Sequence, residues 1–143
     1  MAKLQLRILT SESVKVDDPV DMVIMRCISE DMGHTSATSD IGILPGHMPL
    51  SAILATSSLR IINEGKERVI AVFGGIVKVR DNSVTVLTEK AEWPGEIDLN
   101  QAKHDLDQAE SDYTEIPSSK NRKILKQAKV RVDVASPHFV ENK

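Results

Sequence analysis

Histidine changes its charge near neutral pH, so the four histidines of this 143-residue chain are the first candidates for chemistry. A metal-binding imidazole needs partners at short spacing, such as a second histidine four residues along a helix. The histidines stand too far apart for that pattern, at His34, His47, His104 and His138. We therefore expect no metal site.

Other signatures of catalysis or cofactor binding are missing from the sequence. It has no Gly-x-Ser-x-Gly elbow and no Walker loop, and the pair Gly74 and Gly75 lacks the third glycine of a dinucleotide fingerprint. A net charge of −3, a pI near 5.8 and 3% aromatic residues give no general support for nucleic-acid binding. We expect a non-catalytic protein with no cofactor and no nucleic-acid partner.

His47 lies in a segment, residues 41–50, in which two glycines and two prolines interrupt apolar residues. The glycines permit positive φ or close backbone approach, and the prolines fix φ and remove hydrogen-bond donors. These residues predict a rigid loop that holds His47 in one place. Such a loop could form an active-site wall, hold a metal ligand or dock another subunit, and its residues alone do not choose among the three.

The elements that would position this loop have the pattern of β-strands. Leu4, Leu6 and Ile8 alternate with polar residues, which is the period of a half-buried strand. Further strands are predicted at residues 14–16, 20–28, 50–54, 59–62, 68–73, 76–80 and 84–88. Turns are expected at 17–19 and 56–58, and a polar loop at 29–40. The regular spacing favours an antiparallel β-sandwich or barrel over residues 1–90.

After Pro94 the apolar spacing changes to that of a helix. A helical seam is formed by Leu99, Ala102, Leu106, Ala109, Tyr113 and Ile116. Asp98 is the expected N-cap, Gln101 would complete a capping box, and Pro117 would end the helix. Ser118 or Ser119 is expected to cap a second helix. We therefore predict an α-helical hairpin over residues 91–143, with a frayed tail after about residue 136.

The two predicted helices carry opposite charge. Residues 96–116 contain seven acidic residues and Lys103. Residues 117–135 contain six cations against Asp133, namely Lys120, Arg122, Lys123, Lys126, Lys129 and Arg131. One interpretation is a permanently closed hairpin with exposed ion pairs across it, each contributing about 0.2–1 kcal/mol. The other is a hairpin that opens, because an alanine-rich seam buries little apolar area.

Two motifs resemble those of the epsilon-subunit family of F-type ATP synthases, which is called delta in mitochondria. Residues 42–50, Gly-Ile-Leu-Pro-Gly-His-Met-Pro-Leu, resemble the family's Gly-Ile-Leu-Pro-Gly-His-x-Pro-Leu. Residues 73–79, Phe-Gly-Gly-Ile-Val-Lys-Val, resemble its Ser-Gly-Gly-Phe-x-x-Val. With the helical hairpin that follows, the resemblance covers nearly the whole chain. It implies an N-terminal β-sandwich followed by a C-terminal antiparallel helical hairpin.

The resemblance also implies partners for the sandwich. The chain would be a non-catalytic rotor subunit, one copy in a hetero-oligomer, that couples ion flow through the c-ring to ATP synthesis. Its contacts with the gamma subunit and the c-ring would lie at Asp40, Ile41, Gly42, Leu44, Pro45, Gly46 and His47. The absence of a transit-like leader favours a bacterial or plastid-encoded chain. Of the two, we expect a peripheral position on the cytoplasmic face of a bacterial membrane rather than at the plastid stroma.

For the hairpin, the resemblance implies contact with the alpha and beta catalytic subunits and inhibition of ATP hydrolysis. The six cations of the second helix would pair either with the acidic first helix or with acidic residues of the catalytic head. Val130, Val132 and Val134 lower helix propensity in the final turns, so we expect part of the extended helix to order only inside the head.

The chain departs from the family pattern at a nucleotide motif, Ile/Leu-Asp-x-x-Arg-Ala. Ile97, Asp98 and Ala102 match it, but Gln101 replaces the planar cation that suits phosphate. We expect ATP to bind weakly or not at all. The alternative to the whole resemblance is a β-sandwich adaptor whose basic helix binds an acidic protein.

Overall fold

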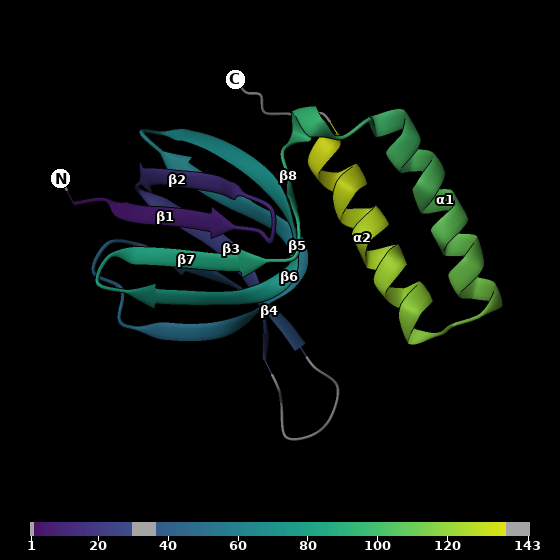
Figure 1. Cartoon of the computed structure of the whole chain (residues 1–143), viewed down its shortest axis with the longest axis horizontal. Coiled ribbons are helices and arrows are strands. Elements are labelled where there is room, and N and C mark those ends of the chain that lie inside the picture. Colours follow the sequence, from purple (N-terminus) through teal and green to yellow (C-terminus); the bar gives the residue numbers. More distant parts are fainter. Residues whose placement is uncertain (1, 30–36, 137–143) are drawn as a thin grey trace.

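The computed structural model describes residues 2–29 and 37–136. It shows an N-terminal β-sandwich with two C-terminal helices beside it (Figure 1). The predicted fold class is therefore confirmed.

Eight strands form the sandwich. They are β1 (Leu4–Leu9), β2 (Val14–Val20), β3 (Met22–Ser29), β4 (Ala37–Ile43), β5 (Leu50–Asn63), β6 (Lys66–Arg80), β7 (Ser83–Thr88) and β8 (Ala91–Glu92). The sheet order is β2-β1-β7-β6-β5-β3-β4, and β8 pairs with β6. Pairing is antiparallel apart from β1 and β7, which run parallel and so depart from the predicted pattern. Mostly aliphatic side chains from the inward faces of β1 to β7 form one continuous core, and Ala91 of β8 belongs to it as well.

Three predicted loops or turns lie wholly or partly in strands. Residues 17–19 belong to β2, where Pro19 pairs with Gln5 on an edge strand, a position that tolerates a missing N–H. Residues 56–58 lie inside β5, which is one strand and not two. Residues 37–43 form β4, which takes the end of the predicted polar loop and the start of the predicted rigid loop. In all three, pairing with distant residues overrides the local turn chemistry.

The strand β6 turns a corner at its two adjacent glycines. The β6 residues that face the sandwich core change from even to odd positions across that pair, from Ile70 and Val72 to Val77 and Val79. Gly75 has φ +131°, and a Cβ placed on it would lie 1.9 Å from the carbonyl oxygen of Leu87. A side chain cannot be accommodated there. The glycines therefore allow one long strand to serve both layers of the sandwich.

The helices begin and end where their caps predict. A short 3₁₀ helix, η1 (Pro94–Glu96), precedes α1 (Leu99–Glu115) and α2 (Ser119–Ala135). The Gln101 amide donates to Asp98 Oδ1 at 3.2 Å, and the Asn121 amide donates to Ser118 Oγ at 3.1 Å. Both N-cap predictions are confirmed. The expected capping box is incomplete, because the Gln101 side chain donates instead to Asp105 at 2.9 Å.

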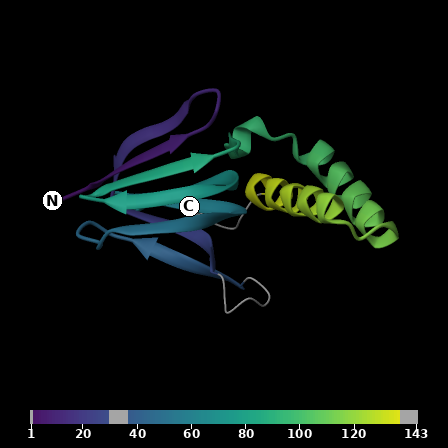
Figure 2. The same ribbon diagram turned by 60° about the horizontal axis from the view of Figure 1, so that its bottom comes forward.

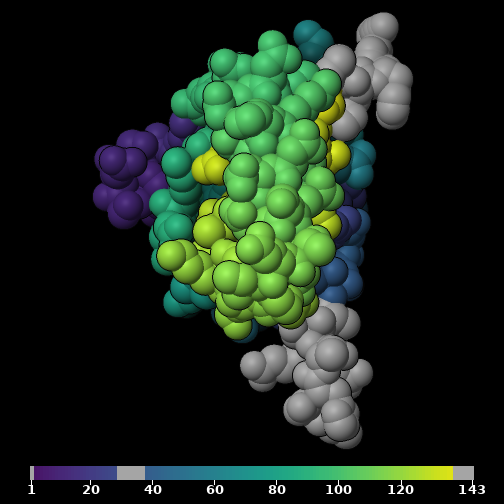
Figure 3. Space-filling view, turned by 90° about the vertical axis from the view of Figure 1, so that its right-hand side faces the viewer, coloured from purple at the N-terminus to yellow at the C-terminus, as the bar shows by residue number. Residues whose placement is uncertain are grey.

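Helix α2 packs on the sandwich, and α1 packs on the outer side of α2 (Figures 1 and 2). The space-filling view shows α1 covering most of α2 from that side (Figure 3). Val130 and Val134 of α2 are buried against Ala71 and Phe73 of β6. The valine-containing turns are helical in this arrangement, because packing on the sheet offsets their weaker helix propensity. The expectation for the extended helix stays a prediction.

Candidate functional site

The segment that joins β4 to β5 is a tight, hydrogen-bonded loop. The amide of His47 donates to the carbonyl oxygen of Leu44 at 3.1 Å, and His47 Nδ1 lies 2.7 Å from the carbonyl oxygen of Met48. Gly46 has φ +86°. Leu44 and Met48 are 54% and 72% exposed, so the loop presents two apolar side chains to solvent. Rigidity was predicted for residues 41–50, and these bonds give it a physical basis over residues 44–49, the part that lies between the strands.

Asn82 holds this loop from the neighbouring hairpin, and the sequence analysis missed it. Its Oδ1 accepts a 2.7 Å hydrogen bond from the amide of Gly46, while its carbonyl oxygen accepts from the amide of Gln5 at 2.8 Å. Asn82 has φ +59°, a conformation that asparagine tolerates better than most residues. The sequence did contain a signal for the turn, the pair Asp81 and Asn82 between two strands. That signal predicts a turn but does not show which distant residues the turn contacts.

The predicted contact residues fall into two groups in the structure. Asp40, Ile41 and Gly42 lie on edge strand β4, where Asp40 pairs with Arg26 of β3 at 2.9 Å. The second group lies in the loop after that strand: Leu44, Pro45, Gly46 and His47. The two groups are continuous along the chain and form one border of the sandwich.

A row of exposed aliphatic side chains crosses the outer face of the sandwich, and it too was missed. Ile53, Ile76 and Leu87 are direct cross-strand neighbours on β5, β6 and β7, and they are 47%, 42% and 42% exposed. Ile28 of β3 pairs with Ile53 and extends the row by one strand. The signal was present as apolar doublets, in which one residue faces the core and its neighbour faces outward. Large exposed apolar surfaces of this kind mark contact sites.

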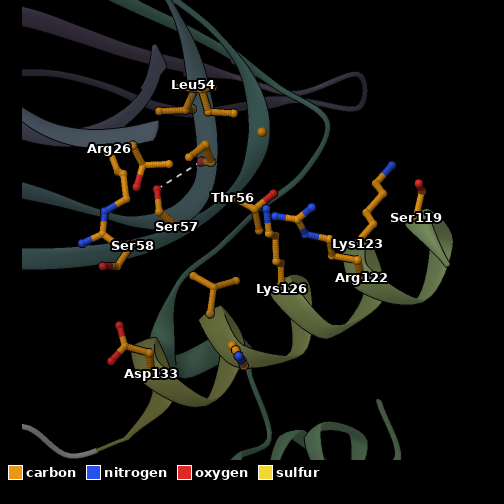
Figure 4. Close-up of a pocket in the computed structure, with 16 residues that line it drawn as sticks. Arg26, Leu54, Thr56, Ser57, Ser58, Ser119, Arg122, Lys123, Lys126 and Asp133 are labelled. Carbon is orange, nitrogen blue, oxygen red and sulfur yellow. Dashed lines mark hydrogen bonds between the residues drawn. The ribbon is translucent and has the colours of Figure 1, made fainter. Parts of the chain in front are cut away.

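The six cations predicted to act together in α2 are divided by the structure. Four of them line a groove between α2 and strand β5 (Figure 4): Arg122, Lys123, Lys126 and Lys129. Arg131 lies elsewhere, with Nε 2.9 Å from Glu92 Oε1 and its guanidinium 4.7 Å from the centre of the Phe73 ring. Lys120 is exposed and outside the groove.

The ion pairs of α2 reach the sandwich and its linker, which corrects the predicted pairing between the helices. Arg131 pairs with Glu92, and Lys123 lies 3.8 Å from Glu89. Among the ion pairs seen within residues 2–29 and 37–136, none joins α1 to α2. The helices instead meet through small side chains, with Ala102, Ala109 and Ala128 buried. The alanine seam between the helices was predicted. The ion pairs expected between α2 and α1 are instead formed between α2 and the residues at Glu89 and Glu92.

The linker before the helices is tied to the sandwich by Glu96. Its carboxylate accepts from the amide of Trp93 at 2.8 Å and lies 2.6 Å from Lys15 Nζ on β2. These contacts, the Lys15 hydrogen bond first, hold the pKa of Glu96 below its usual range. The guanidinium of Arg68 lies 5.1 Å from the centre of the Trp93 ring. The entry to the hairpin is thus fixed at two points.

The three residues that match the nucleotide motif have structural roles here. Asp98 caps α1, Ala102 is 3% exposed in the helix seam, and Ile97 packs against the cluster under α2. Gln101, which replaces the motif's arginine, bonds Asp105. The expectation of weak nucleotide binding stays a prediction.

The described part of the chain carries no group of three or more His, Cys, Asp or Glu side chains placed to hold a metal ion. None of its helices has the length and apolar character needed to cross a membrane.

Comparison with known proteins identifies the sandwich. A family model described as the ATP synthase Delta/Epsilon chain, beta-sandwich domain, matches residues 3–94. The chain belongs to this family. An ATP synthase epsilon chain of Brevibacillus brevis is 40% identical over 116 residues, covering 80% of this chain and 81% of the relative. That of Shouchella clausii is 30% identical over 137 residues, covering 94% and 96%.

The fold of the family recurs in a solved assembly. A chain in the structure of the Euglena gracilis mitochondrial ATP synthase, described as OSCP/F1/c-ring in rotational state 1, aligns with a TM-score of 0.67. The alignment covers 94% of this chain and 78% of that chain at 22% identity. At that identity the likeness shows the fold. The family model and the epsilon-chain relatives show that this chain is an epsilon-type subunit of an ATP synthase complex, in agreement with the predicted resemblance.

Proposed function

We propose that the chain is a non-catalytic rotor subunit of the central stalk, which couples ion flow through the c-ring to ATP synthesis and inhibits ATP hydrolysis through its helices. The observation that supports this most directly is how α2 is attached. It is held on the sandwich by a small apolar cluster and by ion pairs from Arg131 and Lys123. Such an attachment can exchange with a partner.

The sandwich supplies the docking surfaces. The loop at residues 44–49 and the edge strand β4 face outward at one border, and the aliphatic row of Ile53, Ile76 and Leu87 offers apolar area on the outer face of the sandwich. A preformed loop loses little conformational entropy on binding, which suits a permanent contact. We assign this border to the gamma subunit and the c-ring, with one copy of the chain per complex, peripheral to the membrane at its cytoplasmic face.

The closed hairpin is stabilised by modest apolar burial. Val130 and Val134 are the two buried α2 side chains that face the sheet. Complete burial of a valine contributes about 1.5–3 kcal/mol, so two of them set a scale of a few kcal/mol. A partner with acidic residues could offset that loss by pairing with the cations of α2. We therefore propose that the hairpin extends into the catalytic head, against the alpha and beta subunits, and acts there as a brake.

ATP hydrolysis by a catalytic head that lacks this subunit tests the proposal. Addition of the full chain should slow hydrolysis, and a chain ending after Glu92 should not. A second variant carries Glu92→Cys and Arg131→Cys, joined by a thiol cross-linker that prevents extension. Cys27 is buried and should not interfere. If the cross-linked chain inhibits as strongly as the wild type, the brake mechanism is wrong.

The docking assignment has its own test. His47→Asp places a charge in the loop and should weaken capture of the chain by gamma subunit, whereas Lys103→Gln, on the exposed side of α1, should not. Unchanged capture by both variants would remove the loop from the interface. It would also favour the alternative of an adaptor that works through its basic helix.

A further inference from the structure

The groove between α2 and β5 has an uncompensated positive charge. It is an open groove with a volume of about 1010 Å³, walled by α2 on one side and by strands β5 and β3 on the other (Figure 4). Five cations line it: Arg26, Arg122, Lys123, Lys126 and Lys129. Asp133 is the acidic residue on its described lining. This volume is at the upper end of the range typical of small-molecule sites.

Two of the five cations are neutralised from outside the groove. Arg26 pairs with Asp40 and Lys123 with Glu89. The other three, Arg122, Lys126 and Lys129, have no ion pair with any residue of the described chain. They follow one another at intervals of four and three residues, so they occupy one face of α2. Like charges at these intervals destabilise a helix by a few tenths of a kcal/mol per pair, and a bound anion would relieve that repulsion.

The opposite wall supplies neutral hydrogen-bond donors. Thr56, Ser57 and Ser58 line it, and in Figure 4 the side chains of Arg122 and Lys126 reach from α2 toward Thr56. The buried Ser57 hydroxyl already donates to the carbonyl oxygen of Ala55 at 3.0 Å, which leaves its oxygen as an acceptor. Thr56 is therefore the best-placed hydroxyl donor. Cations on one wall and a hydroxyl on the other can surround an oxyanion.

The spacing of the cations favours an anion that carries more than one phosphate group. From Arg122 to Lys129 the helix rises about 10 Å, at 1.5 Å per residue. A single phosphate contacts one or two cations over that length, whereas a diphosphate reaches more of them. The described lining contains no aromatic residue on which a nucleobase could stack. The residues of the family's nucleotide motif lie instead around the start of α1, at Ile97, Asp98 and Ala102.

We propose that this groove binds a compact inorganic anion of the pyrophosphate type, held by Arg122, Lys126, Lys129 and the Thr56 hydroxyl. The anion bridges α2 and β5, so it favours the hairpin packed on the sandwich. If the hairpin is the brake proposed above, the anion opposes braking, because it occupies cations that the extended helix needs. The site itself does not depend on that role.

Titration calorimetry on the isolated full chain, at constant ionic strength, tests the site. Pyrophosphate should bind saturably at one site and more tightly than orthophosphate. Lys126→Gln should weaken binding by about tenfold or more, the effect of losing one charge-assisted contact. Lys120→Gln removes the same charge from the same helix outside the groove and should change the affinity by less than about twofold. Thr56→Val should weaken binding without altering the shape of the strand.

Specific outcomes would overturn the proposal. These are equal weakening by Lys120→Gln and Lys126→Gln, equal affinity for orthophosphate and pyrophosphate, and binding of ATP without binding of pyrophosphate. Thermal melts of each variant without anion show whether folding is intact, and pyrophosphate should raise the wild-type melting temperature. All these measurements use the chain alone. The anion site can therefore be disproved while the hydrolysis assay still supports the brake, and the brake can be disproved while the anion site is confirmed.

Discussion

The side chain of Asn82 accepts a 2.7 Å hydrogen bond from the backbone amide of Gly46 and so ties the β6–β7 turn to the loop that carries His47. The two residues are 36 positions apart in sequence. The exposed loop is therefore supported by the sandwich as well as by its own prolines. That contact gives a direct test of whether the loop is preformed.

Asn82→Gly should loosen the loop without straining the turn, because glycine accepts the positive φ of Asn82. Loss of one hydrogen bond, worth about 0.5–1.5 kcal/mol, should speed hydrogen exchange of the Gly46 amide by up to about tenfold. Asn82→Asp keeps the acceptor oxygen and serves as the control. NMR measures the exchange of the Gly46 amide in the wild type and in both variants. Equal exchange rates in all three would mean that the prolines alone fix the loop.

Gly75→Ala should destabilise the sandwich by several kcal/mol, since its Cβ would lie 1.9 Å from the Leu87 carbonyl oxygen. Gly95→Ala is the matched control, because no atom lies within 4 Å of a Cβ there. Urea denaturation followed by circular dichroism measures both. A Gly75→Ala variant as stable as the Gly95→Ala variant would show that β6 can shift away from β7.

Glu92→Gln should strengthen inhibition of ATP hydrolysis, because it releases Arg131 from the sandwich while leaving the basic helix intact. A loss of about 1 kcal/mol from the closed state raises the extended population by about fivefold. Glu89→Gln breaks the longer and more exposed pair with Lys123 and should have a smaller effect. The measurement is the steady-state hydrolysis rate at limiting concentrations of each variant. Weaker inhibition by Glu92→Gln would contradict the proposed equilibrium.

Glu96 should make stability depend on pH in the acidic range. Its pKa is held below the usual 4.5 in the folded protein, mainly by Lys15, so its contribution is present above pH 4.5. That contribution is lost as the pH falls through the lowered folded pKa. The difference in unfolding free energy between wild type and Glu96→Gln should therefore shrink between pH 6 and pH 3. A constant difference would show that the carboxylate contributes no charge-dependent stability.

MgATP should bind the isolated chain weakly or not at all, because Gln101 stands where the family motif has a planar cation suited to phosphate, and its side chain bonds Asp105 instead. Gln101→Arg should strengthen any binding that exists. Calorimetric titration with MgATP measures both proteins. Submicromolar affinity in the wild type would show that the motif does not need its arginine.

Features decided by neighbouring residues were predictable from the sequence. The caps at Asp98 and Ser118 depend on residues three positions away, and the end of α1 on Pro117. By contrast, residues 56–58 have the chemistry of a turn but lie within β5, because all three pair with β6, even though the pairing of β5 with β3 is interrupted there. Strand pairing of that kind cannot be read from a short window.

The candidate site shows the same division between local and distant contacts. The stiffness of the loop at residues 44–49 follows from its own residues, but its bond to Asn82 does not. The cations of α2 were identifiable by composition alone. Their partners could not be predicted, because Arg131 pairs with Glu92, which lies 39 positions away in the sequence. The groove likewise depends on the packing of α2 against β5.

The parallel pair of β1 and β7 constrains how the chain can fold during its synthesis. Leu4, Leu6 and Ile8 are completely buried, yet one of the two neighbours of β1 is a strand that ends at Thr88. At about 5–20 residues per second, the ribosome takes roughly 4–16 s to proceed from the end of β1 to the end of β7. Throughout that interval the apolar strand β1 lacks one of its two neighbours in the sheet. Both helices follow the last strand along the chain, so the sandwich can close, and present the surface that α2 packs against, before α2 has left the ribosome.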